Sequence, residues 1–126
     1  MTPQKFSLKN RLKSFSYAFN GLKIALKEEH NARIHVIAAL CVVALSIFFN
    51  INIYEWIAVI FAIGLVFVME LINSAIENTA DFISLEKDET IKKIKDLSSA
   101  AVLISATVAL IIGLIIFVPK VLILLS

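Results

Sequence analysis

The chain has few of the residues on which disulfide-rich proteins and soluble nucleotide-binding folds depend. A single cysteine, Cys41, excludes an intramolecular disulfide framework. There are only three glycines and no GxxxxGK[ST] segment, which excludes the phosphate-binding loops of many soluble kinases. The two histidines, His30 and His35, have no partners at metal-ligand spacing, so a zinc site is not expected. Any nucleotide site in this chain must therefore be built from helix side chains.

Apolar residues are what the chain has in excess. Of its 126 residues, 60% are hydrophobic and 17% are charged, whereas a soluble domain is roughly half apolar and about a quarter charged. A chain of this length has too much surface for its volume to bury so many apolar side chains in a water-soluble core. The composition predicts a single membrane-embedded domain that comprises residues 1–126.

Hydrophobic periodicity predicts an all-α fold. Over residues 6–30, apolar positions recur at steps of three and four with lysines between them, which is typical of an amphipathic helix on the membrane surface. Three longer apolar runs predict transmembrane helices. A charged link over residues 84–95 precedes the third run, and Pro119 is expected to end it. The three runs comprise residues 33–50, 53–83 and 96–118.

The placement of lysine and arginine predicts how the chain crosses the membrane. Of twelve such residues, six precede the first apolar run and Arg33 is its first residue, four lie in the charged link, and only Lys120 follows the third run. Basic residues favour the cytoplasmic side of a membrane. We therefore expect a cytoplasmic N-terminus, a cytoplasmic link and an external C-terminus.

The second run carries a polar stripe that ordinary membrane helices lack. Three carboxylates and an amide on one side of a membrane helix are costly and usually mark a functional site. Two carboxylates suit Mg²⁺ that is shared with substrate phosphates, and a third can act as a general base. The stripe falls within an arc of about 100° on a helix and comprises Glu70, Asn73, Ser74, Glu77 and Asp81.

Two other interpretations of this stripe stay open on the residues alone. It could be an ion-paired network that ties helices together without catalysis, or it could line a small proton-coupled transporter or channel. A transport site is expected near the bilayer midplane, whereas these acids lie in the cytoplasmic half of the second run. Lys95 and Asp96 open the third run on the same side, where a lysine can balance phosphate charge.

Small residues on the third run predict an oligomer. Ser105, Ala109 and Gly113 are spaced four apart, and small residues at that step let helix backbones approach closely in lipid. Because three spans in one subunit enclose little space, we expect several subunits to assemble.

The segment Glu70-Leu-Ile-Asn-Ser-Ala-Ile-Glu-Asn, followed by Asp81 and by Lys95-Asp-Leu-Ser-Ser-Ala-Ala-Val-Leu, resembles the prokaryotic diacylglycerol kinase family. The resemblance extends over residues 15–121. It implies an ATP-dependent lipid kinase in the bacterial inner membrane, with three spans and an N-terminal surface helix in each subunit of a homotrimer. It also implies active sites between neighbouring subunits.

Carried over position by position, the resemblance implies roles for individual residues. Glu70 would accept the proton of the lipid hydroxyl, and Glu29 and Glu77 would hold Mg²⁺ with the phosphates. The family has a basic nucleotide contact at position 10, which is Asn10 here, and Arg11 is the neighbour that would replace it. The other implied contacts are Tyr17, Glu86, Lys95 and Asp96 with ATP, and Arg33, Asn73 and Ser99 with the lipid.

The implied substrate is a lipid alcohol. His35, with the preceding Glu28-Glu29-His-Asn, is similar to the undecaprenol kinase branch. The expected reaction therefore transfers the γ-phosphate of ATP to undecaprenol, and diacylglycerol is the alternative acceptor. The expected partners are ATP, the lipid alcohol, membrane lipids and two further copies of the chain, and no nucleic acid.

Overall fold

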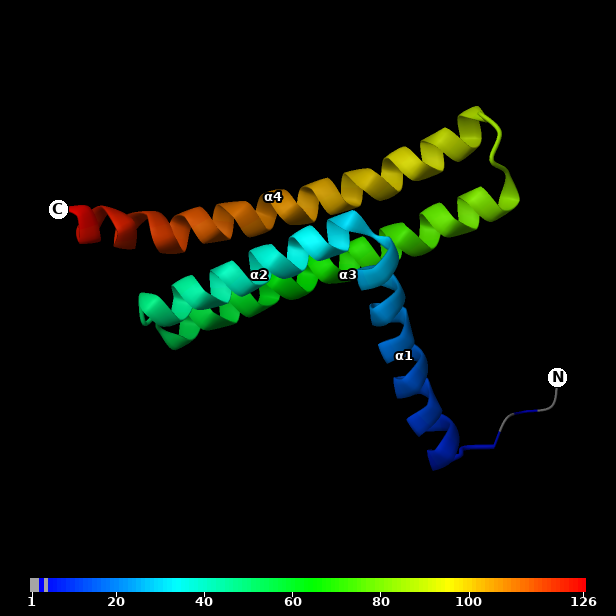
Figure 1. The fold of residues 1–126 in the computed structure, drawn as a ribbon, viewed down its shortest axis with the longest axis horizontal. Helices are drawn as coiled ribbons and strands as arrows, with labels where there is room; N and C mark the ends of the chain where they lie inside the picture. Colours follow the sequence, from blue (N-terminus) through cyan, green and yellow to red (C-terminus); the bar gives the residue numbers. More distant parts are fainter. Residues whose placement is uncertain (1–2, 4) are drawn as a thin grey trace.

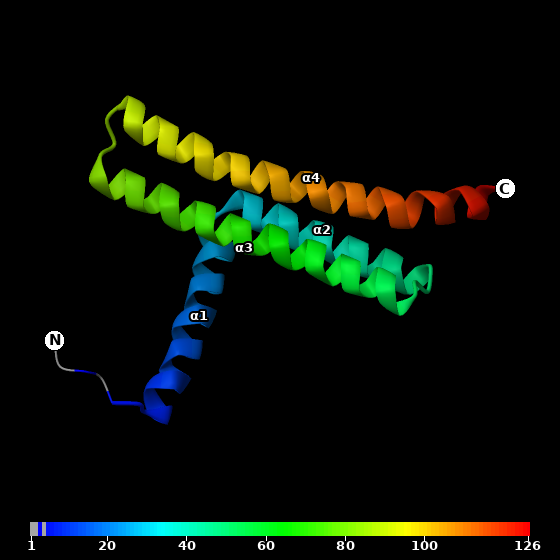
Figure 2. The ribbon, with the colours of Figure 1, turned by 180° about the vertical axis from the view of Figure 1, so that it is seen from behind.

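The computed structural model describes residue 3 and residues 5–126, and these form four helices (Figure 1). The helices α2, α3 and α4 run side by side, and α1 points away from them in both views (Figures 1 and 2). Among the described residues there is no strand. The four helices are α1 (Leu8–Glu28), α2 (His30–Phe48), α3 (Ile53–Ile83) and α4 (Glu89–Leu125).

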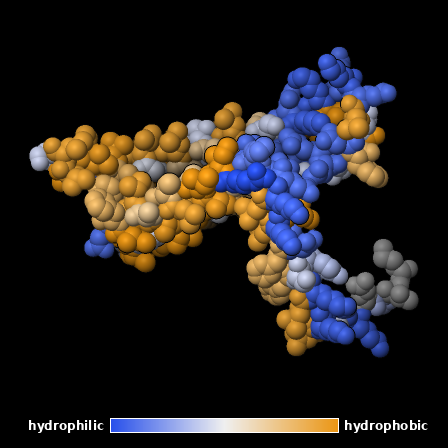
Figure 3. Space-filling model, viewed as in Figure 1, coloured by the Kyte–Doolittle hydropathy of each residue, from blue (hydrophilic) through white to orange (hydrophobic). Residues whose placement is uncertain are grey.

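Three of the helices are long and apolar enough to cross a membrane: α2 with 19 residues, α3 with 31 and α4 with 37. Hydrophobic side chains cover most of their visible surface, whereas hydrophilic ones gather on one side of α1 and around the start of α4 (Figure 3). Such an apolar exterior is unfavourable in water and favourable in lipid. The all-α membrane fold expected from the composition is confirmed in these terms.

A tight turn joins α2 to α3. Asn50 adopts φ 49°, a left-handed conformation that asparagine tolerates better than most residues. The side chain of Asn52 then accepts from the backbone N–H of Glu55 at 2.9 Å, and the Glu55 carboxylate accepts from the backbone N–H of Asn52 at 3.1 Å. This capping box satisfies two backbone donors at the start of α3.

The fourth helix differs from its sequence-based prediction at both ends. It begins at Glu89 because Asp88 caps it, accepting from the backbone N–H of Thr90 at 2.8 Å and of Ile91 at 3.2 Å. Much of the expected link over 84–95 is therefore helix. Pro119 does not end α4, which continues to Leu125. A proline removes only one helical hydrogen bond, and membrane helices tolerate that loss.

The best-packed part of the chain lies at the end of the bundle that holds the α2–α3 turn, called the turn end here. Ile51, Val59, Ile116 and Phe117 form a buried apolar cluster. Beside it, Lys120 of α4 forms an ion pair with Glu55 of α3 at 3.1 Å. The extensive contact between α3 and α4 begins here and continues toward the polar stripe.

Candidate functional site

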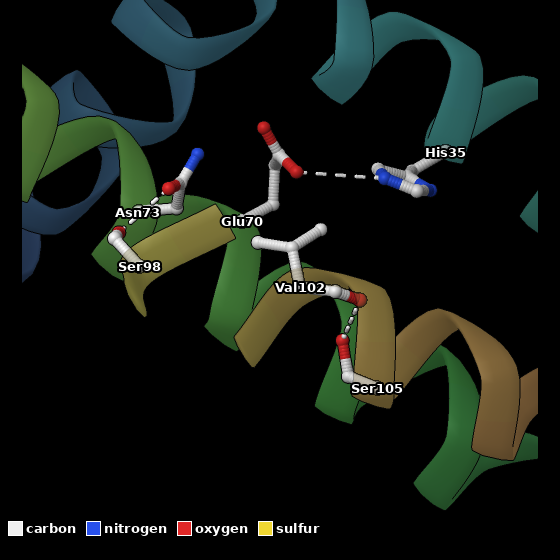
Figure 4. A network of polar contacts seen from close by, with 6 residues as sticks. All are labelled: His35, Glu70, Asn73, Ser98, Val102 and Ser105. Carbon is white, nitrogen blue, oxygen red and sulfur yellow. Dashed lines mark hydrogen bonds and ion pairs between the residues drawn. The ribbon is translucent and has the colours of Figure 1, made fainter. Parts of the chain in front are cut away.

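Glu70 lies in the middle of α3 and is almost completely buried, with 2% of its side chain exposed. Its Oε2 atom lies 3.5 Å from Nε2 of His35 on α2 (Figure 4). This is an ion pair when the imidazole is protonated, but Oε2 has no partner with hydrogen-bond geometry among the described residues. A buried carboxylate oxygen without a hydrogen bond is costly. A carboxylate in this state is suited to receive a proton or a hydrogen bond from a ligand.

A buried hydrogen bond links the stripe on α3 to α4. The hydroxyl of Ser98 donates to Oδ1 of Asn73 at 2.6 Å (Figure 4). The hydroxyl of Ser74, one residue further along α3, is buried and has no partner in the described part of the chain. The site thus holds a fixed amide beside an unbonded hydroxyl.

Two further carboxylates lie near Glu70. Glu29 and Glu77 are close enough for their charges to act on Glu70, and both side chains are half-buried. Glu29 occupies the junction of α1 and α2 with extended backbone, and its side chain forms no capping hydrogen bond. One acid at the α1–α2 junction and one on α3 thus add negative charge in the vicinity of Glu70.

Arg33 holds the junction that carries Glu29. Its Nε donates to the carbonyl of Leu26 at 2.8 Å, and its Nη2 donates to the carbonyl of Lys27. These are carbonyls of the last turn of α1, which has no helical partners for them. The guanidinium that the sequence resemblance assigned to the lipid thus caps α1 in the single chain.

The cationic side chains near the α3–α4 loop pair with acids. Lys95 lies 2.6 Å from Asp81 of α3, and Lys92 lies 2.6 Å from Asp96 one turn further along α4. All four side chains are at least one-third exposed. Solvated ion pairs of this kind contribute little to stability. Either lysine can therefore leave its carboxylate partner and bind a phosphate at low cost.

Several predicted site residues are exposed in the single chain. Arg11 and Tyr17 are exposed on α1, and Ser99 is exposed on α4. Glu86 lies in the α3–α4 loop, where its backbone N–H donates to the Ser84 hydroxyl at 3.1 Å. In a single chain these predicted contacts are therefore exposed, whereas the Glu70 carboxylate is buried.

The carboxylates suit a magnesium ion that is shared with phosphates. No group of three His, Cys, Asp or Glu side chains among residue 3 and residues 5–126 is placed to hold a metal alone. Mg²⁺ usually keeps water and phosphate ligands and takes one or two carboxylates. Glu29 and Glu77 offer two such oxygen donors and no sulfur or imidazole, which fits that requirement.

A cavity of about 310 Å³ lies between α2, α3 and α4. Its walls are apolar apart from His35, and small side chains such as Ala106, Ala109 and Gly113 line the α4 side. His35 therefore stands between the Glu70 carboxylate and an apolar space.

Comparison with known proteins identifies the family of this chain. The family model described as prokaryotic diacylglycerol kinase matches residues 16–117. The chain belongs to the prokaryotic diacylglycerol kinase family. It is 37% identical over 108 residues to the undecaprenol kinase of Bacillus subtilis (strain 168), a match that covers 86% of this chain and 88% of that protein.

Two diacylglycerol kinases are also similar to this family member. The enzyme of Helicobacter pylori (strain J99) is 38% identical over 102 residues, which is 81% of this chain and 80% of that protein. The enzyme of Escherichia coli (strain K12) is 34% identical over 100 residues, covering 79% and 82%. The family resemblance drawn from the α3 and α4 segments is confirmed.

Sequence reasoning missed two residues at the site of this family member. His35 was noted only as a mark of the undecaprenol kinase branch, and Ser98 was passed over for its neighbour Ser99. The signal for His35 is its position, since it is an imidazole inside the apolar run that begins at Ile34. No sequence pattern distinguishes Ser98 from Ser99 as the partner of Asn73, because adjacent serines differ only in the helix face that they occupy.

Proposed function

We propose that the chain is a lipid kinase that transfers the γ-phosphate of ATP to the hydroxyl of undecaprenol. Membership of the family supports ATP-dependent phosphorylation of a lipid alcohol. The similarity to the undecaprenol kinase of Bacillus subtilis supports the polyprenol. The observation that carries the proposal is the buried Glu70 carboxylate with an unbonded oxygen, held among polar side chains of an apolar helix bundle.

In the proposed reaction, Glu70 takes the proton of the lipid hydroxyl. The hydroxyl oxygen forms a bond to the γ-phosphorus, the bond from that phosphorus to the bridging oxygen breaks, and ADP leaves with the electron pair. A positioned base of this kind contributes about 10²–10⁴-fold to a rate. The Asn73 amide, fixed by Ser98 at 2.6 Å, would keep the acceptor side of the site polar, and Ser99 and Arg33 would contact the lipid headgroup.

Glu29 and Glu77 are the proposed holders of Mg²⁺ together with the phosphates. The ion would neutralise phosphate charge, which is most of what phosphoryl transfer requires from its surroundings. Lys95 and Asp96 would address the nucleotide after exchange of their pairs with Asp81 and Lys92. The remaining proposed nucleotide contacts are Arg11, Tyr17 and Glu86.

We place the site at the cytoplasmic face of a bacterial inner membrane. Eleven of the twelve lysines and arginines lie on the side of the bundle that holds the α1–α2 junction and the α3–α4 loop, which favours the cytoplasmic side for both. Six of them precede α2, Arg33 lies in its first turn, Lys87 lies in the α3–α4 loop, and three lie in the first two turns of α4 (Lys92, Lys93 and Lys95). Apolar and hydrophilic side chains occupy different sides of α1 (Figure 3), so α1 would lie in the membrane interface. The hydroxyl of a lipid would then meet cytosolic ATP beside Glu70.

The proposed assembly is a homotrimer with sites between subunits. Tyr17, Glu86 and Ser99 are exposed in the single chain, and so is much of the apolar surface of α2 and α4. A neighbouring subunit would cover that surface and bring exposed nucleotide contacts to the Glu70 region.

The test is a transfer assay with purified protein in detergent micelles, labelled ATP and Mg²⁺. Undecaprenol and diacylglycerol are offered in separate reactions, and the labelled lipid is identified. The proposal predicts labelled undecaprenyl phosphate. Preferential labelling of diacylglycerol would support the second candidate, which the Helicobacter pylori and Escherichia coli relatives favour. Label on neither lipid would overturn the kinase proposal.

A further inference from the structure

His35 is an unusual residue for its surroundings. The residues of α2 that follow it are apolar as far as Leu45 except for Cys41. The next polar side chain, Ser46, donates its hydroxyl hydrogen bond to the Val42 carbonyl of its own helix at 2.7 Å. His35 has no such local partner among the described hydrogen bonds, and its Nε2 instead faces Glu70 on α3 at 3.5 Å. Polar side chains within membrane helices usually serve a function.

The imidazole is held in one orientation. Only 22% of the His35 side chain is exposed. The ring packs edge-on against Phe67, with ring centroids 6.4 Å apart and an interplanar angle of 71°. Phe67 precedes Glu70 by one helical turn, so the same face of α3 contacts both the ring and its nitrogen. Apolar cavity walls border the rest of the ring.

We propose that His35 is a positioning residue for Glu70, a role that rests on the kinase function proposed above. Its Nε2 atom, 3.5 Å from Oε2, holds that oxygen of the carboxylate toward α2. The other carboxylate oxygen then points away from the imidazole (Figure 4), where it is available for the lipid hydroxyl.

The charges around Glu70 explain why such a partner is needed. Glu29 from the α1–α2 junction and Glu77 from α3 both act on Glu70 with like charge. On the α4 side, Ser98 is engaged with Asn73. Among the described residues, the His35 imidazole is the one side chain that offers the Glu70 carboxylate a nitrogen within 4 Å, with Nε2 at 3.5 Å from Oε2. Without it, the carboxylate would turn away from its neighbours and lose the geometry needed for proton transfer.

The test compares His35→Ala and His35→Gln with His30→Gln. The glutamine amide places an N–H donor at about the reach of Nε2 but cannot carry a proton, whereas alanine removes the donor. His30 is exposed, so His30→Gln controls for the same chemical change on the same helix. The readouts are kcat and KM for ATP in the undecaprenol assay, with oligomer size and Tm measured for each variant.

A positioning role predicts that His35→Ala lowers kcat by about 100-fold, the cost of a base misplaced by about 1 Å, with little change in KM, oligomer size or Tm. His35→Gln should recover most of that loss, and His30→Gln should match the wild type. A His35→Gln variant as slow as His35→Ala would overturn the role, as would normal kcat in His35→Ala. A fall in Tm with unchanged kcat would assign His35 to helix packing instead. Wild-type protein that labels no lipid would refute the kinase function itself.

Discussion

The two ends of α3 differ in whether their polar groups have partners. At the turn end, Asn52 and Glu55 satisfy the helix start, and Glu55 also pairs with Lys120 at 3.1 Å. At the other end, which begins at Glu70 and is called the site end here, Glu70 and Ser74 carry buried polar atoms without hydrogen bonds. The turn end is built for stability. The site end keeps unsatisfied groups of the kind that a ligand can satisfy, which is common at functional sites.

This contrast predicts that equivalent substitutions at the two ends have different consequences. Changes at the site end should reduce turnover while the protein stays folded, and changes at the turn end should reduce stability while turnover persists. The variants below run from the largest expected effect to the smallest.

Glu77→Gln should lower lipid phosphorylation by more than about 100-fold, because a proposed magnesium ligand loses its charge and even outer-shell partners of metals cost about 10–100-fold. Raising the Mg²⁺ concentration should restore part of the rate. Glu55→Gln is the matched control on the same helix and should retain its Mg²⁺ dependence. If Glu77→Gln titrates with Mg²⁺ like the wild type, the proposed metal ligation is wrong.

Lys95→Met should raise the KM for ATP by about tenfold, since a charge contact worth about 1–4 kcal/mol is lost. Asp81→Asn frees Lys95 from its 2.6 Å pair and should leave the KM unchanged or lower. Steady-state assays at varied ATP concentration distinguish the two. Equal KM values for Lys95→Met and wild type would remove Lys95 from the nucleotide site.

The contrast between Ser98 and Ser99 shows that contacts between helices cannot be predicted from spacing within one helix. Periodicity and composition predict the apolar spans and place Glu70, Asn73 and Glu77 on one stripe, because those patterns depend only on spacing along one helix. Which serine meets Asn73 depends on how α4 is rotated against α3. The contact of His35 with Glu70 likewise depends on the register of α2 against α3, which no spacing within one helix contains.

Helix ends were predicted less well for a physical reason. The charged segment before the third run looked like a link, but Asp88 caps a helix there, and a charged helix that projects from the membrane is stable when capped. Pro119 was expected to end α4, but the Lys120–Glu55 pair holds the next residue on α3.

Ser98→Ala should destabilise the protein by about 0.6 kcal/mol, a typical value for a hydrogen bond between membrane helices, because Asn73 loses its partner. Ser99→Ala, at an exposed position, should leave stability unchanged. Thermal unfolding of both variants in the same detergent provides the comparison. A larger loss in Ser99→Ala than in Ser98→Ala would contradict the helix faces assigned here.

Lys120→Met should have the smallest effect, about 0.3 kcal/mol, because the Lys120–Glu55 pair is partly solvated. A double-mutant cycle with Glu55→Gln isolates the pair. Turnover per folded protein should match the wild type in all three variants. A strong loss of turnover here would show that the turn end also serves catalysis.

The most direct measurement for the central claim is phosphate transfer to undecaprenol by Glu70→Gln at matched oligomer size. Glutamine keeps the shape of the buried side chain but is a very weak base. If the polar stripe on α3 is catalytic, the variant elutes as the same oligomer and its kcat falls by about 10²–10⁴-fold. A variant that transfers phosphate at the wild-type rate, or one that loses its assembly while the remaining oligomer stays active, would contradict the account.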